Sequence, residues 1–178
     1  LSHGHEATTV SFAMLLNLAA VANSDNPAVL WGFLRRYAPE ASPENHPRLD
    51  KLVGYACVYF RDFVAPKKQY RAADAVERDA LQQVSDLLGR LPADASAEAI
   101  QHALYDVARP IPRYQDLKAK GATPERPGVS NEFFNMIYAV LLGEERGPRL
   151  GSFIQLYGIA ETQALIARAL AGELVKAA

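Results

Sequence analysis

Cysteine is nearly missing from this sequence, and long hydrophobic runs are missing altogether. The single cysteine, Cys57, cannot form an internal disulfide, and one thiol without neighbouring ligands cannot hold a structural zinc ion. No apolar run reaches the ~18 residues that a membrane-spanning helix needs. The first twenty residues also lack the basic start and the cleavage site of a signal peptide. These absences predict a soluble, cytoplasmic protein that does not act at a membrane.

An excess of charge of one sign is lacking as well. Lysine and arginine together number 19 against 20 aspartates and glutamates, so the formal net charge is -1. The overall charge therefore excludes histone-like binding of nucleic acid driven by net positive charge, but a local basic patch is still compatible with it. With 178 residues, of which 49% are hydrophobic, the chain suits one globular domain, or one with a small appendage. It begins with Leu1 instead of Met, as a piece of a longer polypeptide would.

The apolar residues recur at helical spacing along almost the whole chain. Residues 8–22 carry the broad apolar stripe of a buried helix, and Asn26 followed by Pro27 fits the cap and first position of a second helix. Further helices are expected near residues 49–64, 73–91, 96–107, 130–142, 150–157 and 160–171. No internal repeat and no convincing pair of alternating strands is found. We therefore predict an all-α fold, a helical bundle or cage of about eight helices.

A proline-rich segment interrupts this pattern. Four prolines and two glycines fall between Arg109 and Ser130, so this part is expected to be mostly loop, with one turn of helix near Asp116. The sequence thus predicts an N-terminal helical subdomain (residues 1–109), a loop (110–129) and a C-terminal helical subdomain (130–178), together forming one compact all-α unit.

Motifs for catalysis are also lacking. The sequence contains no glycine-rich phosphate loop, no nucleophile elbow and no zinc-protease motif. The tract His3-Gly4-His5-Glu6 has metal-ligating residues, but without a third cluster a linker is the simpler interpretation. His46 and His102 stand alone, and Cys57 has no basic neighbour in its helical turn, which is typical of a buried, inert thiol. We expect no catalytic residue, metal site or cofactor in this chain.

Basic residues gather in loops and at helix ends. The four clusters are Arg35-Arg36, Lys67-Lys68, residues 109–120, and Arg146 with Arg149. Several have an aromatic neighbour, such as Tyr37, Tyr70 or Tyr114. Single-stranded RNA is bound by cations that pair with phosphates and by rings that stack on bases. Because most domains of this size carry a similar number of exposed cations, a non-catalytic, all-helical protein-interaction module is the alternative.

The C-terminal third adds a more specific signal. The segment from Tyr138 to Gly158, with the run Gly147-Pro148-Arg149-Leu150-Gly151-Ser152-Phe153, resembles the end of the bacterial class I lysyl-tRNA synthetases. Similar stretches lie at residues 10–18, 31–37, 59–63 and 126–130, so the resemblance covers most of the chain. It implies a helical C-terminal domain that holds the anticodon stem-loop of tRNA(Lys). That domain would be joined to an N-terminal catalytic domain of the same chain, which uses ATP. The full-length protein would then be a lysine-tRNA ligase, and this fragment alone would be non-catalytic.

The resemblance also implies where the RNA would bind. Related glutamyl-type synthetases end in a similar helix-loop-helix, whose loop and flanking helix ends contact the anticodon. By position, Tyr138 stands where that pattern has arginine and Gly147 where it has threonine, while Pro148 matches. We therefore favour the neighbouring polar residues. The complete set of expected tRNA-binding residues is Arg146, Gly147, Arg149, Leu150, Ser152, Tyr138, Arg35, Arg36, Lys67 and Lys68.

The residues of this loop also allow a physical interpretation. Gly147 would let the backbone approach a ligand, and the first N–H groups of the following helix, with Arg149 beside them, would form an anion site. Alternatively, Gly143, Gly147 and Pro148 simply make a tight turn between two helices; both interpretations can hold together. Further along the helix, Phe153, Leu156 and Tyr157 are expected to pack in the core.

Overall fold

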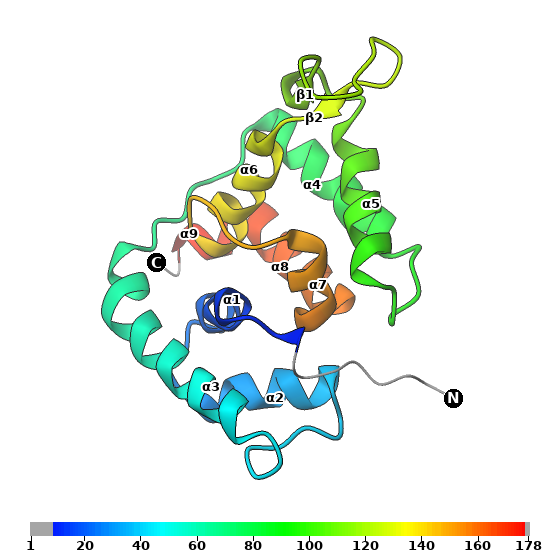
Figure 1. Cartoon of the computed structure of the whole chain (residues 1–178). Helices are drawn as coiled ribbons and strands as arrows, with labels where there is room; N and C mark the ends of the chain where they lie inside the picture. Colours follow the sequence, from blue (N-terminus) through cyan, green and yellow to red (C-terminus); the bar gives the residue numbers. More distant parts are fainter. Residues whose placement is uncertain (1–8, 177–178) are drawn as a thin grey trace. The chain divides into compact units, whose positions relative to one another are not determined.

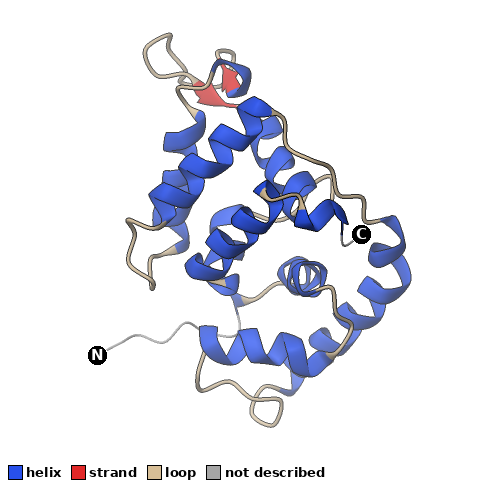
Figure 2. Ribbon diagram, turned by 180° about the vertical axis from the view of Figure 1, so that it is seen from behind, coloured by secondary structure: helices blue, strands red, loops and turns tan. Residues whose placement is uncertain are grey.

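The computed structural model describes residues 9–176 (Figure 1). Within these residues the secondary structure is helical, apart from one pair of two-residue strands (Figure 2). The prediction of an all-α fold is therefore confirmed. Residue packing divides the chain into two units, residues 1–68 and 69–178.

Three helices build the first unit. They are α1 (Phe12–Ala22), α2 (Pro27–Tyr37) and α3 (Pro47–Tyr59), and α3 continues into a π-helical segment (Phe60–Val64) and a 3₁₀ turn (Ala65–Lys67). The side chain of Asn26 caps α2 by accepting the N–H of Ala28, and Pro27 takes the first helical position, as predicted. The core of the unit consists of fully buried apolar side chains, including Leu15, Leu18, Leu30, Leu34 and Val53.

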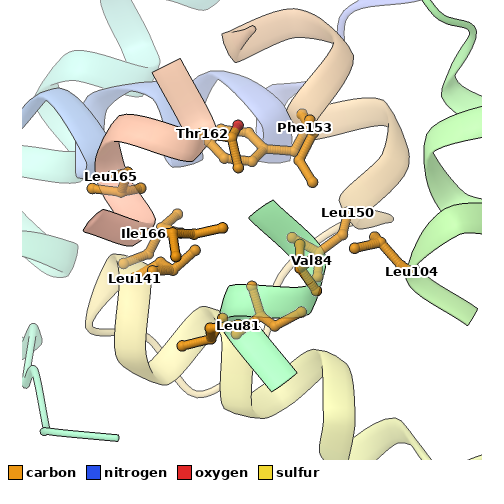
Figure 3. A pocket seen from close by; sticks show the side chains of 12 residues that line it. Leu81, Val84, Leu104, Leu141, Leu150, Phe153, Thr162, Leu165 and Ile166 are labelled. Carbon is orange, nitrogen blue, oxygen red and sulfur yellow. The ribbon is translucent and has the colours of Figure 1, made fainter. Parts of the chain in front are cut away.

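The second unit contains the other helices and the strand pair. Its elements are α4 (Ala75–Leu88), α5 (Ala97–Ala108), a 3₁₀ turn (Pro112–Tyr114), β1 (Gln115–Asp116), β2 (Gly128–Val129), α6 (Asn131–Leu142), α7 (Leu150–Tyr157), α8 (Ile159–Leu170) and α9 (Glu173–Lys176). Side chains of α4 to α8 fill its interior (Figure 3). About 10 Å³ is left between them, which is too little for a ligand. This interior is a packed core and offers no binding pocket.

The division between the two units does not follow the proline-rich segment. It lies between Lys68 and Gln69, whereas the sequence predicted one compact unit with its internal boundary at residues 110–129. The elements on both sides of that segment pack together, since Gln101 of α5 accepts the backbone N–H of Gly151 in α7 at 2.8 Å. Proline and glycine thus report turns in the chain, which do not have to coincide with a gap in packing.

None of the helices within residues 9–176 is both long enough and apolar enough to span a membrane.

Candidate nucleic-acid interface

The connection between α6 and α7, residues 143–149, is the part of the second unit that sequence reasoning placed at the RNA. Gly143 ends α6 with φ +71°, the left-handed conformation predicted for it, and its N–H bonds to the carbonyl of Tyr138. The carbonyl of Gly143 accepts the N–H of Gln69 at 2.9 Å. The ring of Tyr70 also lies beside this glycine. The segment that begins the second unit therefore lies against the start of the connection.

Tyr138 fills the inside of this connection. Its side chain is 1% exposed, and its hydroxyl donates a hydrogen bond to the carbonyl of Pro148. A Cβ atom added to Gly147 would lie 2.6 Å from Cζ of Tyr138, closer than side chains tolerate. The space beside the backbone of Gly147, which was expected to admit a ligand, is thus occupied by the ring of Tyr138. The interpretation of these residues as a tight helix-helix turn describes the structure.

The N-terminus of α7 is also partly used by the protein itself. The N–H of Gly151, which sequence reasoning offered to an anion, already donates to Oε1 of Gln101 in the interior. Leu150 is 2% exposed. Phe153 and Leu156 are buried as predicted, while Tyr157 is partly exposed and stacks on Phe153 with ring centroids 5.6 Å apart. Tyr138, Gly147 and Leu150 therefore hold the shape of the connection and present little or no side chain to a ligand.

Three of the expected residues at the connection do reach solvent. Arg146 and Arg149 are exposed and Ser152 is partly exposed. The charge around them is balanced, because Glu144 and Glu145 precede Arg146 in sequence. Arg149 in turn lies 3.8 Å from a carboxylate oxygen of Glu98, a loose and exposed ion pair. The connection thus offers arginines without a local excess of positive charge.

The other four expected residues belong to the first unit. Arg35 and Lys67 are exposed, and the exposed guanidinium of Arg36 lies 5.2 Å from the ring centroid of Phe33. Lys68 is turned inward, since its amine donates to the carbonyl of Ala20 in the last turn of α1 at 2.7 Å. That position suits a cation at a helix C-terminus, so Lys68 is engaged in holding α1.

Sequence reasoning missed a short hairpin in the proline-rich segment. β1 and β2 pair antiparallel, with Gln115 opposite Val129 and Asp116 opposite Gly128. The turn of helix in this segment is the 3₁₀ turn Pro112–Tyr114, slightly before the expected place near Asp116. Strands of two residues are too short to show an alternating pattern, and the sequence therefore gave no signal for them.

An ion-pair network joins the start of α4 to the base of this hairpin. Arg71 donates to both carboxylate oxygens of Glu77, at 2.8 and 2.7 Å, and Glu77 forms a reciprocal capping box with Asp74. Asp74 also accepts from Arg113 at 2.7 Å. The hydrogen bonds from Arg71 lower the pKa of Glu77. The pKa of Asp74 is lowered first by the N–H of Glu77 and then by Arg113.

The isolated histidines and the cysteine form no reactive cluster among residues 9–176. His102 is exposed and lies 3.8 Å from Asp106 one helical turn away, while His46 precedes α3. Cys57 is buried, and desolvation, with a smaller contribution from Asp25, raises the pKa of its thiol. Within the described residues no three metal-ligating side chains come together. The tract His3-Gly4-His5-Glu6 lies outside these residues.

Comparison with known proteins relates this sequence to one class of enzyme. Over 166 residues, 93% of the chain, the sequence is 45% identical to a lysine-tRNA ligase of Roseobacter denitrificans. Ligases of the same name from Rickettsia bellii and Rickettsia felis are 39% and 37% identical over 170 residues, again 93% of the chain. The chain resembles one segment of lysine-tRNA ligases. It spans about 30% of the length of these relatives.

The similarity to lysine-tRNA ligases extends through both units, and it confirms the resemblance recognised in the sequence. The alternative of a protein-interaction module is not favoured. No family model matches the chain. No solved structure matches it either.

Proposed function

We propose that this chain is the C-terminal, anticodon-binding part of a bacterial class I lysine-tRNA ligase and that it binds the anticodon stem-loop of tRNA(Lys) in the cytoplasm. The observation that carries the proposal is the similarity to lysine-tRNA ligases over 93% of the chain, combined with coverage of about 30% of their length. The mainly helical structure and the exposed cations of the expected set also support a role in holding RNA.

This proposal divides the work of the enzyme between two parts of one polypeptide. The complete ligase would attach lysine to tRNA with ATP, and the N-terminal catalytic domain would bind ATP and lysine. Contacts made far from the reacting atoms can still accelerate a reaction, because their binding energy holds the substrate in a productive position. Because the sequence contains no catalytic motif, we assign no catalytic residue to this chain. Its role is to orient the tRNA.

The exposed cations of the expected set are the proposed RNA contacts. At the connection between α6 and α7 these are Arg146 and Arg149, with the hydroxyl of Ser152 nearby, and in the first unit they are Arg35, Arg36 and Lys67. Unstacked bases of an RNA loop are recognised along their edges, while cations contact the phosphates. Tyr138, Gly147, Leu150 and Lys68 would contribute by holding the surrounding backbone.

The test is a titration of the chain with tRNA(Lys) and with the same tRNA carrying a substituted anticodon. An anticodon-binding domain should bind the native tRNA about tenfold more tightly, a difference worth about 1.4 kcal/mol. Both titrations are repeated at two salt concentrations to separate phosphate contacts from base contacts. Equal, weak binding of both tRNAs would contradict the proposal and fit the protein-interaction module.

A second measurement tests the division of work between the two parts of the ligase. The isolated chain should form no lysyl-adenylate, so ATP-pyrophosphate exchange with lysine should stay at background. Exchange above background would mean that this chain contains an active site.

A further inference from the structure

The cations of the second unit are concentrated in the hairpin segment, residues 109–130. This segment contains five of the twelve lysines and arginines of residues 69–178 but only two of their fourteen aspartates and glutamates. The remainder of the unit therefore has seven cations against twelve acidic residues. A polyanion that approaches this unit is therefore attracted more strongly to the hairpin segment than to the remainder of the unit.

The hairpin segment is anchored at its base. Tyr114 is 2% exposed and packs edge to face on Phe133 of α6, with ring centroids 5.1 Å apart. Arg109 donates to the carbonyl of Pro127 at 2.9 Å, and Gln115 donates back to the carbonyl of Arg109 at 3.0 Å. These contacts join the two ends of the segment to each other and to the helical core. In Figures 1 and 2 the segment projects beyond the ends of α4, α5 and α6.

Local hydrogen bonds also shape the tip of the hairpin, residues 117–126. Thr123 and Arg126 exchange two backbone hydrogen bonds of 3.1 Å, and Gly121 supplies a left-handed turn at φ +80°. The side chain of Asp116 accepts the N–H of Lys118 at 3.0 Å, so this carboxylate is used within the backbone of the hairpin. The cations of the tip are thus presented on an ordered turn.

Three cations of the segment are available to a ligand. Lys118, Lys120 and Arg126 are exposed, and none of them forms an ion pair with another of the residues that the structure describes. The other two are engaged, Arg109 with Pro127 and Arg113 with Asp74. We call Lys118, Lys120 and Arg126 the tip cations.

The composition of the tip indicates which part of an RNA it suits. Residues 117–126 contain no aromatic side chain, and they therefore provide no ring on which a splayed base could stack. Cations without rings suit the sugar-phosphate backbone, which double-stranded RNA presents along its whole length. The tip also lies before the N-terminus of α6, whereas Arg146 and Arg149 follow its C-terminus. Between them in the chain lies α6, whose twelve residues form a helix roughly 18 Å long.

We propose that the tip cations form a second RNA contact, which binds backbone phosphates of a double-stranded RNA stem. This inference rests on the proposed function, because it assumes that the chain binds tRNA. It adds a contact to a part of the RNA other than the anticodon loop.

The test compares two triple variants that remove the same amount of charge. The tip variant is Lys118→Gln with Lys120→Gln and Arg126→Gln. The control variant is Arg90→Gln with Arg168→Gln and Lys176→Gln, which changes three exposed cations of the same unit outside the hairpin segment. Each variant and the unmodified chain are titrated with tRNA(Lys) over a salt series. They are also titrated with a short single-stranded oligonucleotide of the anticodon-loop sequence.

The tip variant should bind tRNA(Lys) at least tenfold more weakly than the control variant at low salt. The slope of log affinity against log salt should decrease by about 2 to 3 in the tip variant, because that many phosphate contacts are lost. Binding of the single-stranded oligonucleotide should be the same for both variants. Circular dichroism should show unchanged helicity, and a Lys118→Arg, Lys120→Arg variant should retain wild-type affinity.

The measurements distinguish a failure of the proposed function from a failure of the tip contact. If the unmodified chain does not bind tRNA(Lys), the proposed function itself is wrong. If it binds but the tip variant matches the control, the tip contact is wrong and the proposed function stands. An equal loss of the single-stranded oligonucleotide would overturn the assignment to a stem. If the Gln variant unfolds and the Arg variant loses affinity, the hairpin is a structural element, and the proposal of an RNA contact is also overturned.

Discussion

The two ends of α6 lead into segments that look alike in sequence and differ in structure. Both segments contain glycine, proline and arginine close together. After α6, the ring of Tyr138 lies against Gly147, and the N–H of Gly151 is bonded to Gln101. Before α6, the hairpin is anchored at its base and presents exposed cations at its tip. Glycine near a helix turn can therefore serve the protein's own side chains as readily as it serves a ligand.

Among the variants that test this difference, Gly151→Ala is expected to change the free energy of unfolding most. A Cβ atom there would lie 2.9 Å from Cβ of Gln101 and would also press on the backbone of Ala97, so α5 and α7 would have to separate. We expect the free energy of unfolding to fall by about 3 kcal/mol, the upper range for an overpacked core. Urea denaturation followed by circular dichroism measures this change.

Gly32→Ala is the matched control for that variant. Gly32 lies in the exposed part of α2, and an added Cβ would meet nothing within 4 Å. Alanine should stabilise this helix by about 0.5 to 1 kcal/mol. Similar midpoints for the two variants would show that α5 and α7 do not approach each other as closely as the structure indicates.

Gly147→Ala separates the two explanations of the α6–α7 connection. If the glycine makes room for Tyr138, the variant should lose about 2 kcal/mol of unfolding free energy, as is usual for overpacking. Adding Tyr138→Leu should recover part of that loss, because the shorter side chain makes space for the methyl group. A variant with unchanged stability and weakened tRNA binding would instead show that Gly147 is kept for the ligand.

Acid should loosen the network at the base of the hairpin. The pKa of Glu77 is lower in the folded chain than its ordinary value of about 4.5, so its ionised form stabilises the fold above that pH. This contribution, about 1 to 2 kcal/mol for a partly exposed charged hydrogen bond, is lost as the pH falls from about 4.5 towards the lowered pKa. Glu77→Gln should therefore show a shallower decrease of unfolding free energy between pH 5 and 3. Parallel curves for the variant and the wild type would contradict this assignment.

Arg149→Ala is expected to change the free energy of unfolding least. Its ion pair with Glu98 is long and exposed, so unfolding free energy should change by less than about 0.5 kcal/mol. If Arg149 contacts a phosphate of the anticodon loop, tRNA binding should weaken by about 1 kcal/mol. Arg90→Ala and Lys176→Ala, which change exposed cations outside the proposed contacts, serve as controls and should cost less affinity. Equal losses at the three positions would indicate general basicity in place of a located contact.

The sequence predicted those parts of the fold that depend on neighbouring residues. Ser96 and Ser130 cap α5 and α6, and Gly143 ends α6, because capping requires only residues a few positions apart. The chemistry of the site depends on contacts between distant residues. No local pattern links Gln101 to Gly151, fifty positions away, or aims the amine of Lys68 at Ala20. The charge balance around Arg149 likewise depends on Glu98, which belongs to another helix.

The buried hydrogen bond between Gly151 and Gln101 also has a consequence for hydrogen exchange. The amide proton of Gly151 can exchange with solvent only when α5 and α7 come apart, and both helices belong to the core of the second unit. Exposed loop amides, such as that of Lys120, exchange through much smaller openings. The protection factor of Gly151 therefore reports the free energy for opening the second unit. It can be followed by NMR, separately from the unfolding of the first unit.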